Sequence, residues 1–198
     1  MGLRFNYDNG QTPLTEEERE GLIVQSISSR KELDEFEQLN IQLAVEWSLT
    51  QRFNIENILS LSFILNVHKK MFSKTWKWAG TLRKTNKNIG IDKFLILQEL
   101  KLLIDDCEYW IKNEIYTKDE ISIRFKHRLV WIHPFPNGNG RHSRLCADIL
   151  ISRVFEEEVF TWGRLSLVDS GESRATYLDA IYAADKGEIT PLLKFARS

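Results

Sequence analysis

The sequence predicts an all-α fold, a helical bundle that carries one small β-hairpin flap. Apolar residues recur every three to four positions through most of the 198 residues, which is the spacing of one face of an α-helix. Several of these segments begin with a serine or threonine three residues ahead of a glutamate, the pattern of a capping box at a helix start. A glycine- and asparagine-rich segment between short β-compatible stretches interrupts the helices and predicts the hairpin.

The first part of the chain predicts a short arm. Thr15 and Glu18 form a capping-box pattern, so a short helix is expected to begin there and to end at Gly21. A second capping box follows, and a long helical pattern begins behind it. We therefore divide the chain into an N-terminal arm, residues 1–28, and one domain, residues 29–198.

The domain is expected to contain further helices. Their predicted segments are 29–49, which opens with the capping box of Ser29 and Glu32, then 60–72, 96–111, 117–132, 145–154 and a last helix from 190. Pro134 ends one of them, because the residue before a proline is disfavoured in the α region. Thr190 and Pro191 are predicted to be the N-cap and the first-turn residue of the last helix.

Overall charge and cysteine usage restrict the classes of function. The formal net charge is −1 and the isoelectric point is about 6.5, so no basic field exists to hold nucleic acid, and direct nucleic-acid binding is not expected. No apolar run approaches the length of a membrane span. Cys107 and Cys146 lie in helical patterns without a C-x-x-C spacing, which predicts buried free thiols and a cytoplasmic protein.

One dense segment, HPFPNGNGRHSR at 133–144, lies between two predicted helices. Gly138 and Gly140 allow backbone N–H groups to converge where the second helix begins, and a helix start offers unsatisfied donors and a positive dipole end. Arg141 and Arg144 are three residues apart, so they share a helical face, and their forked guanidinium groups match phosphate oxygens. The segment predicts a site for a ligand with several phosphates.

His133 and Asn137 are the residues of this segment with predicted chemical roles. An imidazole can take up a proton near neutral pH, so His133 is the candidate general base. Asn137 can offer its side-chain carbonyl oxygen to a Mg²⁺ ion that arrives with the phosphates, because this hard ion takes oxygen ligands. Both roles require a phosphate to be held beside them at the start of the second helix.

Three other interpretations of the segment are simple helix capping, a dinucleotide-binding fingerprint and a metal site. An isolated glycine-rich turn before a helix is often simple capping, and the dinucleotide-binding fingerprint needs a strand in front and a third glycine where this chain has Ser143. His133 and His142 lack the acidic cluster or helical spacing of a metal site. His68 and His127 lie inside helical segments and are predicted to be structural.

The segment resembles the motif of the Fic family, His-Pro-Phe-x-(Asp/Glu/Asn)-Gly-Asn-Gly-Arg-x-x-Arg, at every fixed position. The similarity extends from about Ser29 to Phe195. The segments MFSKTWKWAGTLR and SRATYLDAIYAADKGEITPLLKF are similar to the Fic subgroup called mobile mystery protein B. This resemblance implies a helical Fic fold and the transfer of a nucleoside monophosphate, usually AMP from ATP, to a protein hydroxyl.

The resemblance also implies a role for each motif residue. His133 would deprotonate the Ser, Thr or Tyr hydroxyl of the target, and Phe135 would anchor the segment in the core. The phosphates of ATP would be held by Gly138, Asn139, Gly140, Arg141 and Arg144, and Mg²⁺ by Asn137.

The expected hairpin would be the flap of the Fic fold. In the family this flap receives the backbone of the target protein as an added strand, a known mode of peptide binding. The residues concerned lie between 85 and 91, and we assign the docking role to Thr85, Asn88, Ile89 and Gly90. The alternative is an ordinary surface hairpin without a role in binding.

Two positions decide between activities within the family. Asn137 stands where most adenylyltransferases of the family have an acid, which leaves transfer of UMP, GMP or phosphocholine, or a non-catalytic nucleotide-binding module, as alternatives. The Doc branch, which phosphorylates its target, resembles this motif but has lysine at the position of Gly140. Glycine leaves the space of the γ-phosphate open, which favours transfer of AMP.

An inhibitory element is also implied. Many Fic proteins carry the pattern (Ser/Thr)-x-x-x-Glu-(Gly/Asn), whose glutamate pairs with the second arginine of the motif. Glu20 and Gly21 match its end, while Glu16 stands where Ser or Thr is expected, so an acid-rich capped helix without inhibition is the alternative. A separately encoded helix-turn-helix protein is the other candidate for an inhibitory partner, and the target protein is unknown.

Overall fold

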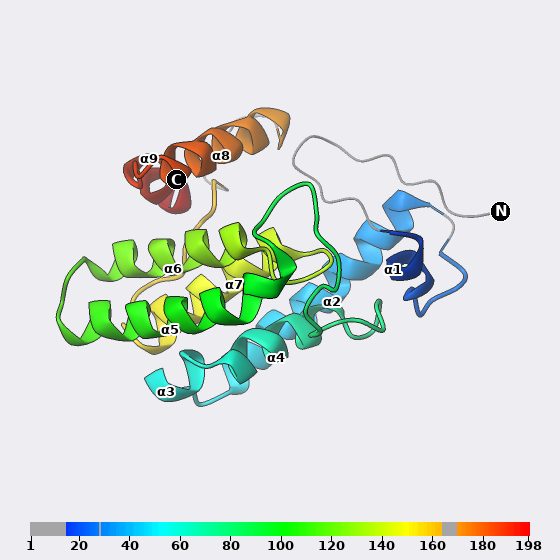
Figure 1. Ribbon diagram of the computed structural model, residues 1–198, viewed down its shortest axis with the longest axis horizontal. Coiled ribbons are helices and arrows are strands. Elements are labelled where there is room, and N and C mark those ends of the chain that lie inside the picture. Colours follow the sequence, from blue (N-terminus) through cyan, green and yellow to red (C-terminus); the bar gives the residue numbers. More distant parts are fainter. Residues whose placement is uncertain (1–14, 28, 164–169) are drawn as a thin grey trace.

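Nine α-helices make up most of the residues that the computed structural model describes, which are 15–27, 29–163 and 170–198 (Figure 1). The helices are α1 Glu16–Glu20, α2 Arg30–Thr50, α3 Ile55–Ile58, α4 Leu61–Phe72, α5 Ile96–Lys112, α6 Lys118–Ile132, α7 Asn139–Arg153, α8 Ser170–Asp185 and α9 Thr190–Arg197, with a short 3-10 helix, η1 Lys93–Leu95, before α5. The predicted all-α class is confirmed.

The predicted helix starts are confirmed wherever a capping box marks them. Thr15 and Glu18 exchange side-chain and backbone hydrogen bonds at α1, and Ser29 and Glu32 do the same at α2. These bonds satisfy N–H groups that a helix start would otherwise leave without partners. The helix starts could be predicted because the pattern needs only residues three positions apart.

The start of α9 differs from the prediction by one position. Thr190 is the first helical residue, and the N-cap is Ile189, which makes no side-chain capping bond. Ile189 is buried in an apolar cluster, so packing and not a hydroxyl cap fixes this helix start. Pro191 lies in the first turn, where its missing N–H costs no hydrogen bond.

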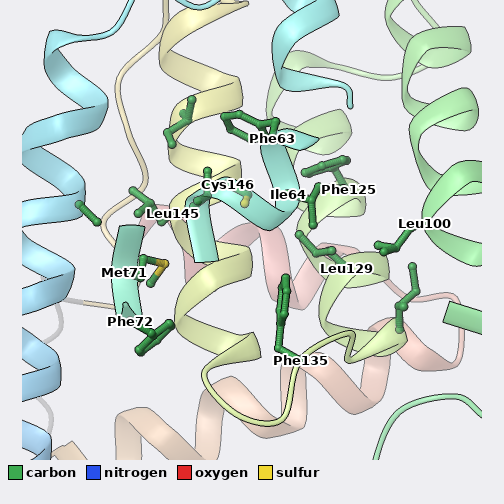
Figure 2. Packing of buried hydrophobic residues seen from close by; sticks show 14 of the residues in the cluster. Phe63, Ile64, Met71, Phe72, Leu100, Phe125, Leu129, Phe135, Leu145 and Cys146 are labelled. Atoms are coloured by element: carbon green, nitrogen blue, oxygen red, sulfur yellow. The ribbon is translucent and has the colours of Figure 1, made fainter. Parts of the chain in front are cut away.

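The main core lies among α2, α4, α5, α6 and α7, where α6 packs against both α5 and α7 (Figure 1). Figure 2 shows aromatic side chains from several of these helices meeting in it, among them Phe72 at the end of α4 and Phe125 of α6. Phe135, from the loop between α6 and α7, is fully buried in the same cluster. The position of this loop is therefore fixed by the core.

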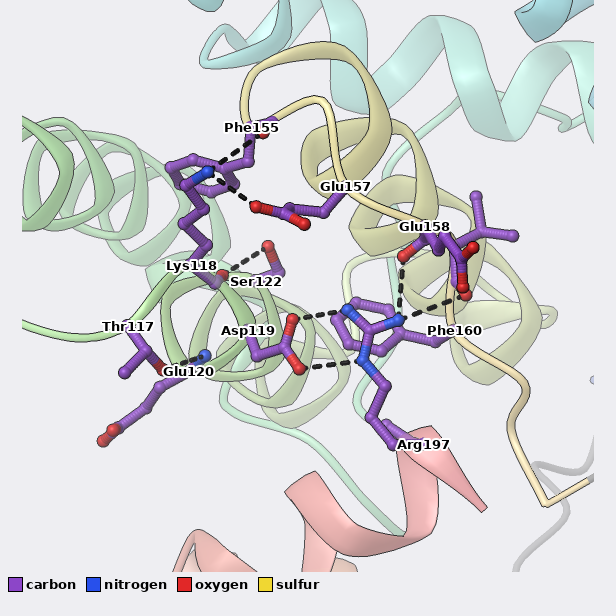
Figure 3. Close-up of polar contacts among 12 residues, drawn as sticks. Thr117, Lys118, Asp119, Glu120, Ser122, Phe155, Glu157, Glu158, Phe160 and Arg197 are labelled. Atoms are coloured by element: carbon purple, nitrogen blue, oxygen red, sulfur yellow. Dashed lines mark hydrogen bonds and ion pairs between the residues drawn. The ribbon is translucent and has the colours of Figure 1, made fainter.

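The last two helices close a second, smaller core beside α6 and α7. Arg197 of α9 holds this part in place: its Nε donates to Asp119 of α6 at 2.8 Å, and its Nη1 donates to the backbone oxygen of Glu158 at 2.8 Å (Figure 3). The same guanidinium group lies over the ring of Phe160, 4.3 Å from its centroid. α8 packs against α9, and Tyr177 of α8 contacts Arg144 of α7.

The predicted β-hairpin flap is wrong. Residues 81–92, which we call the covering loop, contain no β-strand. The cause is Arg83, whose buried guanidinium group donates hydrogen bonds to the backbone oxygens of Thr85, Ile91 and His133. These bonds from one side chain take the carbonyl oxygens that a cross-strand ladder would need.

The amino-terminal arm is joined to the segment that precedes the covering loop. An isolated antiparallel bridge pairs Leu22 with Trp76, and the N–H of Ile23 donates to the oxygen of Thr75 at 2.9 Å. Leu22 and Ile27 are buried in the main core. The boundary that we predicted at residue 28 stays a prediction, and the residues just before it pack with the helices of the domain.

The two cysteines are buried and free, as predicted. Cys107 and Cys146 are buried and are not in disulfides, and burial raises the pKa of the Cys146 thiol. Among the helices of residues 15–27, 29–163 and 170–198, none is both long and apolar enough to cross a membrane.

Candidate active site

The loop between α6 and α7, residues 133–138, brings the predicted catalytic and phosphate-binding groups together; we call it the motif loop. His133 is the C-cap of α6, and Gly138 is the N-cap of α7. His133 has a left-handed backbone conformation with φ 55°, which is uncommon for a residue other than glycine and recurs at functional sites. The fold thus reverses the chain at the histidine and starts a helix six residues later, at Asn139.

The imidazole of His133 is buried and neutral. Its Nδ1 lies 3.3 Å from the backbone oxygen of Val130, and an acceptor there requires the proton to be on Nδ1. The lone pair of the neutral ring is then on Nε2. The pKa of His133 is lowered to about 4: burial is the largest cause, the bond to Val130 acts in the opposite direction, and the nearby charges of Arg83 and Lys87 add to the lowering. At neutral pH the ring is able to accept a proton.

The covering loop lies directly on His133, whose residual exposure is 5%. At Gly90, φ is +90°, and an added Cβ would overlap the Cβ of His133 and lie 3.2 Å from the oxygen of Ile132. Only glycine allows the two backbones to approach so closely. Asn88 and Ile89 are exposed beside it. Of the predicted flap residues, Gly90 therefore covers His133, while Asn88 and Ile89 face solvent.

Arg83 joins the covering loop to the motif loop, and sequence reasoning missed it. Its Nε donates to the oxygen of His133 at 2.7 Å, and its backbone N–H donates to the oxygen of Pro134 at 2.9 Å. Within the covering loop it binds the oxygen of Thr85 at 2.9 Å. No local pattern distinguishes this arginine from the lysines around it, because its partners in the motif loop are about fifty residues away.

Two side chains give the motif loop its shape. Asn139 is buried, and its amide exchanges two hydrogen bonds of 2.9 Å with the backbone of Phe135. His68 of α4 accepts from the N–H of Gly80 at Nδ1, so its Nε2 donates to the backbone oxygen of Asn137 at 3.0 Å. His68 is stacked on Phe135 with ring centroids 3.7 Å apart. The side chain of Asn139 is thus used within the loop, and its N–H is the group left for a ligand.

The two glycines of the motif play different parts. Gly138 has φ +79°, and a Cβ added there would lie 2.6 Å from the ring of Phe72. Gly140 lies in the first turn of α7, and a Cβ added there would meet nothing within 4 Å. Gly138 is therefore required by the fold, whereas Gly140 borders open space at a helix start whose first N–H groups have no partners within the helix. Such a helix start attracts anions.

Arg141 and Arg144 share one face of α7 but have different partners: a carboxylate for Arg141 and an aromatic ring for Arg144. Nη1 of Arg141 donates to Glu37 of α2 at 2.7 Å. Arg144 lies over the ring of Tyr177 of α8, 4.3 Å from its centroid, and its Nε is buried without a hydrogen-bond partner among the described residues. Tyr177 also accepts a hydrogen bond of 2.6 Å from the fully buried Lys126. Positive charge consequently collects around Arg144.

Burial and charge oppose each other in this cluster. Burial raises the pKa of Tyr177, while Lys126 and Arg144 lower it, and the net result is a pKa below the ordinary value. Burial lowers the pKa of Lys126. Sequence reasoning missed both residues. For Tyr177 the reason is that the apolar residues of α8 are spread around the helix and give no face that predicts which residue turns inward.

The short helix α1 contacts the covering loop. Lys87 pairs with Glu18, and the two side chains are only 3% and 12% exposed. Thr85 donates a second hydrogen bond to the same carboxylate at 3.4 Å. Glu20, which the sequence pattern makes the candidate inhibitory residue, is exposed. Its inhibitory role stays a prediction, and the acidic residue of α1 that reaches the covering loop is Glu18.

The motif loop offers a metal ion one neutral ligand. Oδ1 of Asn137 accepts the N–H of Gly138 at 2.6 Å. Among the residues that the structure describes, no three His, Cys, Asp or Glu side chains form a group that could hold a metal. Mg²⁺ is commonly bound by substrate phosphates and water with few protein ligands. Binding of Mg²⁺ by the phosphates and by Asn137 therefore stays a prediction.

The buried histidines make stability dependent on pH. Burial lowers the pKa of both His133 and His142 to about 4, from 6.5 in the unfolded chain. Between these values the unfolded chain binds protons that the folded chain does not, so the free energy of unfolding should fall as pH falls. We expect a loss of roughly 2 kcal/mol per histidine between pH 7 and 5. Urea unfolding at the two pH values measures it, and equal midpoints would contradict it.

The chain is similar to Fic proteins in its motif and its fold. Residues 58–151 match the Fic/DOC family. The match includes the covering loop and the whole motif. It does not test the similarity to the mobile mystery protein B subgroup, which stays a prediction.

Named relatives and solved structures show the same similarity. The chain is 24% identical over 170 residues to protein adenylyltransferase Fic of Aedes aegypti, a match that covers 83% of this chain and 32% of that protein. It thus spans about a third of the length of this relative. The Fic domain containing signaling protein of Bacteroides thetaiotaomicron has a similar fold, with a TM-score of 0.67, 18% identity and coverage of 92% of this chain and 75% of that one.

A further solved structure contains a nucleotide. BepC, a VirB-translocated effector protein of Bartonella tribocorum with bound AMPPNP, matches with a TM-score of 0.66 and 17% identity, over 92% of this chain and 97% of that one. At this identity the similarity shows the fold alone.

Proposed function

We propose that this chain is a protein adenylyltransferase that transfers AMP from ATP to a Ser, Thr or Tyr hydroxyl of a target protein. The observation that carries the proposal is the motif loop, which sets a neutral imidazole at one end and an open helix start with two arginines at the other. The match to the Fic/DOC family and the relatives named protein adenylyltransferase support it. Gly140 supports it further, because open space is left where a third phosphate would lie.

His133 is the general base in this proposal. With Nδ1–H bound to the oxygen of Val130, Nε2 accepts the proton of the target hydroxyl. The hydroxyl oxygen then forms a bond to the α-phosphorus of ATP, and the bond from that phosphorus to the bridging oxygen of the β-phosphate breaks. The products are the AMP-modified target and pyrophosphate, and the proton is on His133.

The start of α7 binds the phosphates. The backbone N–H groups of Asn139 and Gly140 donate to phosphate oxygens, and Arg141 and Arg144 balance the negative charge. Gly138, whose N–H donates to Asn137, sets the turn that starts the helix. Mg²⁺, held by the phosphates and by Asn137, would neutralise part of the charge of the leaving group.

Labelled ATP tests the proposal. Label from the α-phosphate should enter protein in the presence of Mg²⁺, label from the γ-phosphate should not, and His133→Ala should abolish incorporation. His127→Ala is the matched control, because His127 pairs with Asp185 at 2.8 Å, away from the motif loop. Incorporation only from UTP, GTP or a phosphocholine donor would replace AMP by another group. Tight ATP binding without incorporation, also in Gly90→Ala, would favour a non-catalytic binding module.

A further inference from the structure

Glu37 is a buried carboxylate that touches the motif from outside it. It belongs to α2, and its residual exposure is 3%. Each of its oxygens accepts one short hydrogen bond: Oε1 from the indole Nε1 of Trp76 at 2.6 Å, and Oε2 from Nη1 of Arg141 at 2.7 Å. A charge as deeply buried as this is stable only when paired and hydrogen-bonded, and Glu37 meets both conditions.

The carboxylate is itself held rigidly. Trp76 is almost completely buried in the main core and is stacked on Trp78, with ring centroids 4.9 Å apart. α2, which carries Glu37, packs along α4. Two packed elements therefore fix the position of the oxygen that meets Arg141, and neither of them belongs to the motif.

The guanidinium group of Arg141 is restrained on one face and at one nitrogen atom. Its guanidinium group lies over the ring of Phe72, 5.1 Å from the centroid, and Nη1 is bound to Glu37. A guanidinium group is planar and carries five N–H donors, so fixing one face and one nitrogen fixes the direction of the remaining edge. The same Phe72 ring lies against Gly138, so the start of α7 and the arginine share one support.

We infer that Glu37 is the positioning residue of Arg141: it holds the guanidinium group so that the Nε and Nη2 edge faces a phosphate bound at the start of α7. This inference rests on the proposed function. In this arrangement the negative charge of Glu37 balances the positive charge of Arg141. The positive charge of Arg144 and Lys126, both beside Tyr177, is then available to balance the phosphates of the ligand. The opposite possibility is that Glu37 occupies the place of a phosphate, and the two predict opposite signs of effect.

A series of nucleotides with one, two and three phosphates separates positioning from general damage. Binding of AMP, ADP and AMPPNP is measured by calorimetry for the wild type, Glu37→Gln and the matched control Glu35→Gln, an exposed residue of the same helix. In Glu37→Gln the amide NH₂ faces one of the two donors, so one of the two contacts is lost. The loss should appear only with ligands whose outer phosphates reach Arg141.

We expect Glu37→Gln to weaken the binding of ADP and AMPPNP by roughly 10- to 100-fold, by analogy with residues that orient metal ligands. Binding of AMP should not change in this variant, and Glu35→Gln should bind all three nucleotides as the wild type does. Equal weakening of all three ligands would mean a structural role only, and tighter binding would mean that Glu37 blocks the phosphate; either result overturns the inference, as would no change. If Glu37→Gln does not fold, Glu37→Asp, which keeps the charge but shortens the reach, should give the same order of losses. A wild type that binds none of the ligands would overturn the proposed function, and this inference with it.

Discussion

Gly138→Ala is expected to lower the free energy of unfolding by about 2 to 5 kcal/mol, the sum of the cost of a left-handed alanine and of overpacking a filled core. The backbone at Gly138 has φ +79°, and a methyl group there would lie 2.6 Å from the ring of Phe72. That ring is almost completely buried in the main core and cannot move aside without displacing its neighbours. A loss of this size is a large part of the stability of a typical domain.

Gly140→Ala, two residues further on, is the matched control. Its methyl group would meet nothing within 4 Å and would lie in the first turn of α7, so stability should stay the same or rise by up to ~1 kcal/mol. Binding of AMPPNP should nevertheless weaken, because the methyl group enters the space assigned to phosphate. Urea unfolding and calorimetry of both variants measure the two effects. If both variants lost stability equally, or if Gly140→Ala bound as the wild type does, the division of roles would be wrong.

Gly90→Ala is expected to lift the covering loop off His133. The added methyl group would overlap the Cβ of His133, and relieving that overlap should shift the balance toward an open loop by about 1 to 3 kcal/mol, or roughly 5- to 150-fold. Gly187→Ala is its control: Gly187 has φ +95° but has no atom within 4 Å of an added Cβ. Both variants carry the strain of a left-handed alanine, and only the first disturbs the contact.

The pKa and the chemical reactivity of the His133 imidazole report on the opening of the covering loop. In Gly90→Ala the pKa of His133 should rise from about 4 toward the ordinary value of 6.5, because the burial that lowers it is lost. Its reaction with diethylpyrocarbonate at pH 7 should accelerate in the same variant. NMR titration and mass spectrometry follow the two changes. If His133 behaved alike in both variants, the covering loop would not control access to it.

Those parts of the fold that depend on residues close together in the sequence could be predicted from it. Capping boxes fixed the starts of α1 and α2, and the motif placed His133 at the end of α6 and both arginines on α7. What supports the site could not be predicted in this way. Glu37 lies 104 residues from Arg141, and in the sequence it is one acidic residue among several on α2.

The error in the covering loop has the same origin. Its composition is compatible with a hairpin, and only the three-dimensional structure shows that Arg83 binds its carbonyl oxygens from the inside. α8 was missed because its apolar residues do not line one face. A long-range contact made by one side chain can therefore override a local preference for strand, while local capping remained a reliable guide to the helices.

The pairing of Glu18 with Lys87 ties the amino-terminal arm to the part of the chain that shields the imidazole. To uncover the ring, the molecule must either part these two charges or carry the arm along with the departing segment. Thermodynamic linkage then works in both directions: a ligand that stabilises the arm in this position raises the free energy needed to expose His133, and a ligand that binds the exposed ring weakens the contact between the arm and the covering loop by the same amount. The contact between α1 and the covering loop thus couples the arm to the exposure of His133.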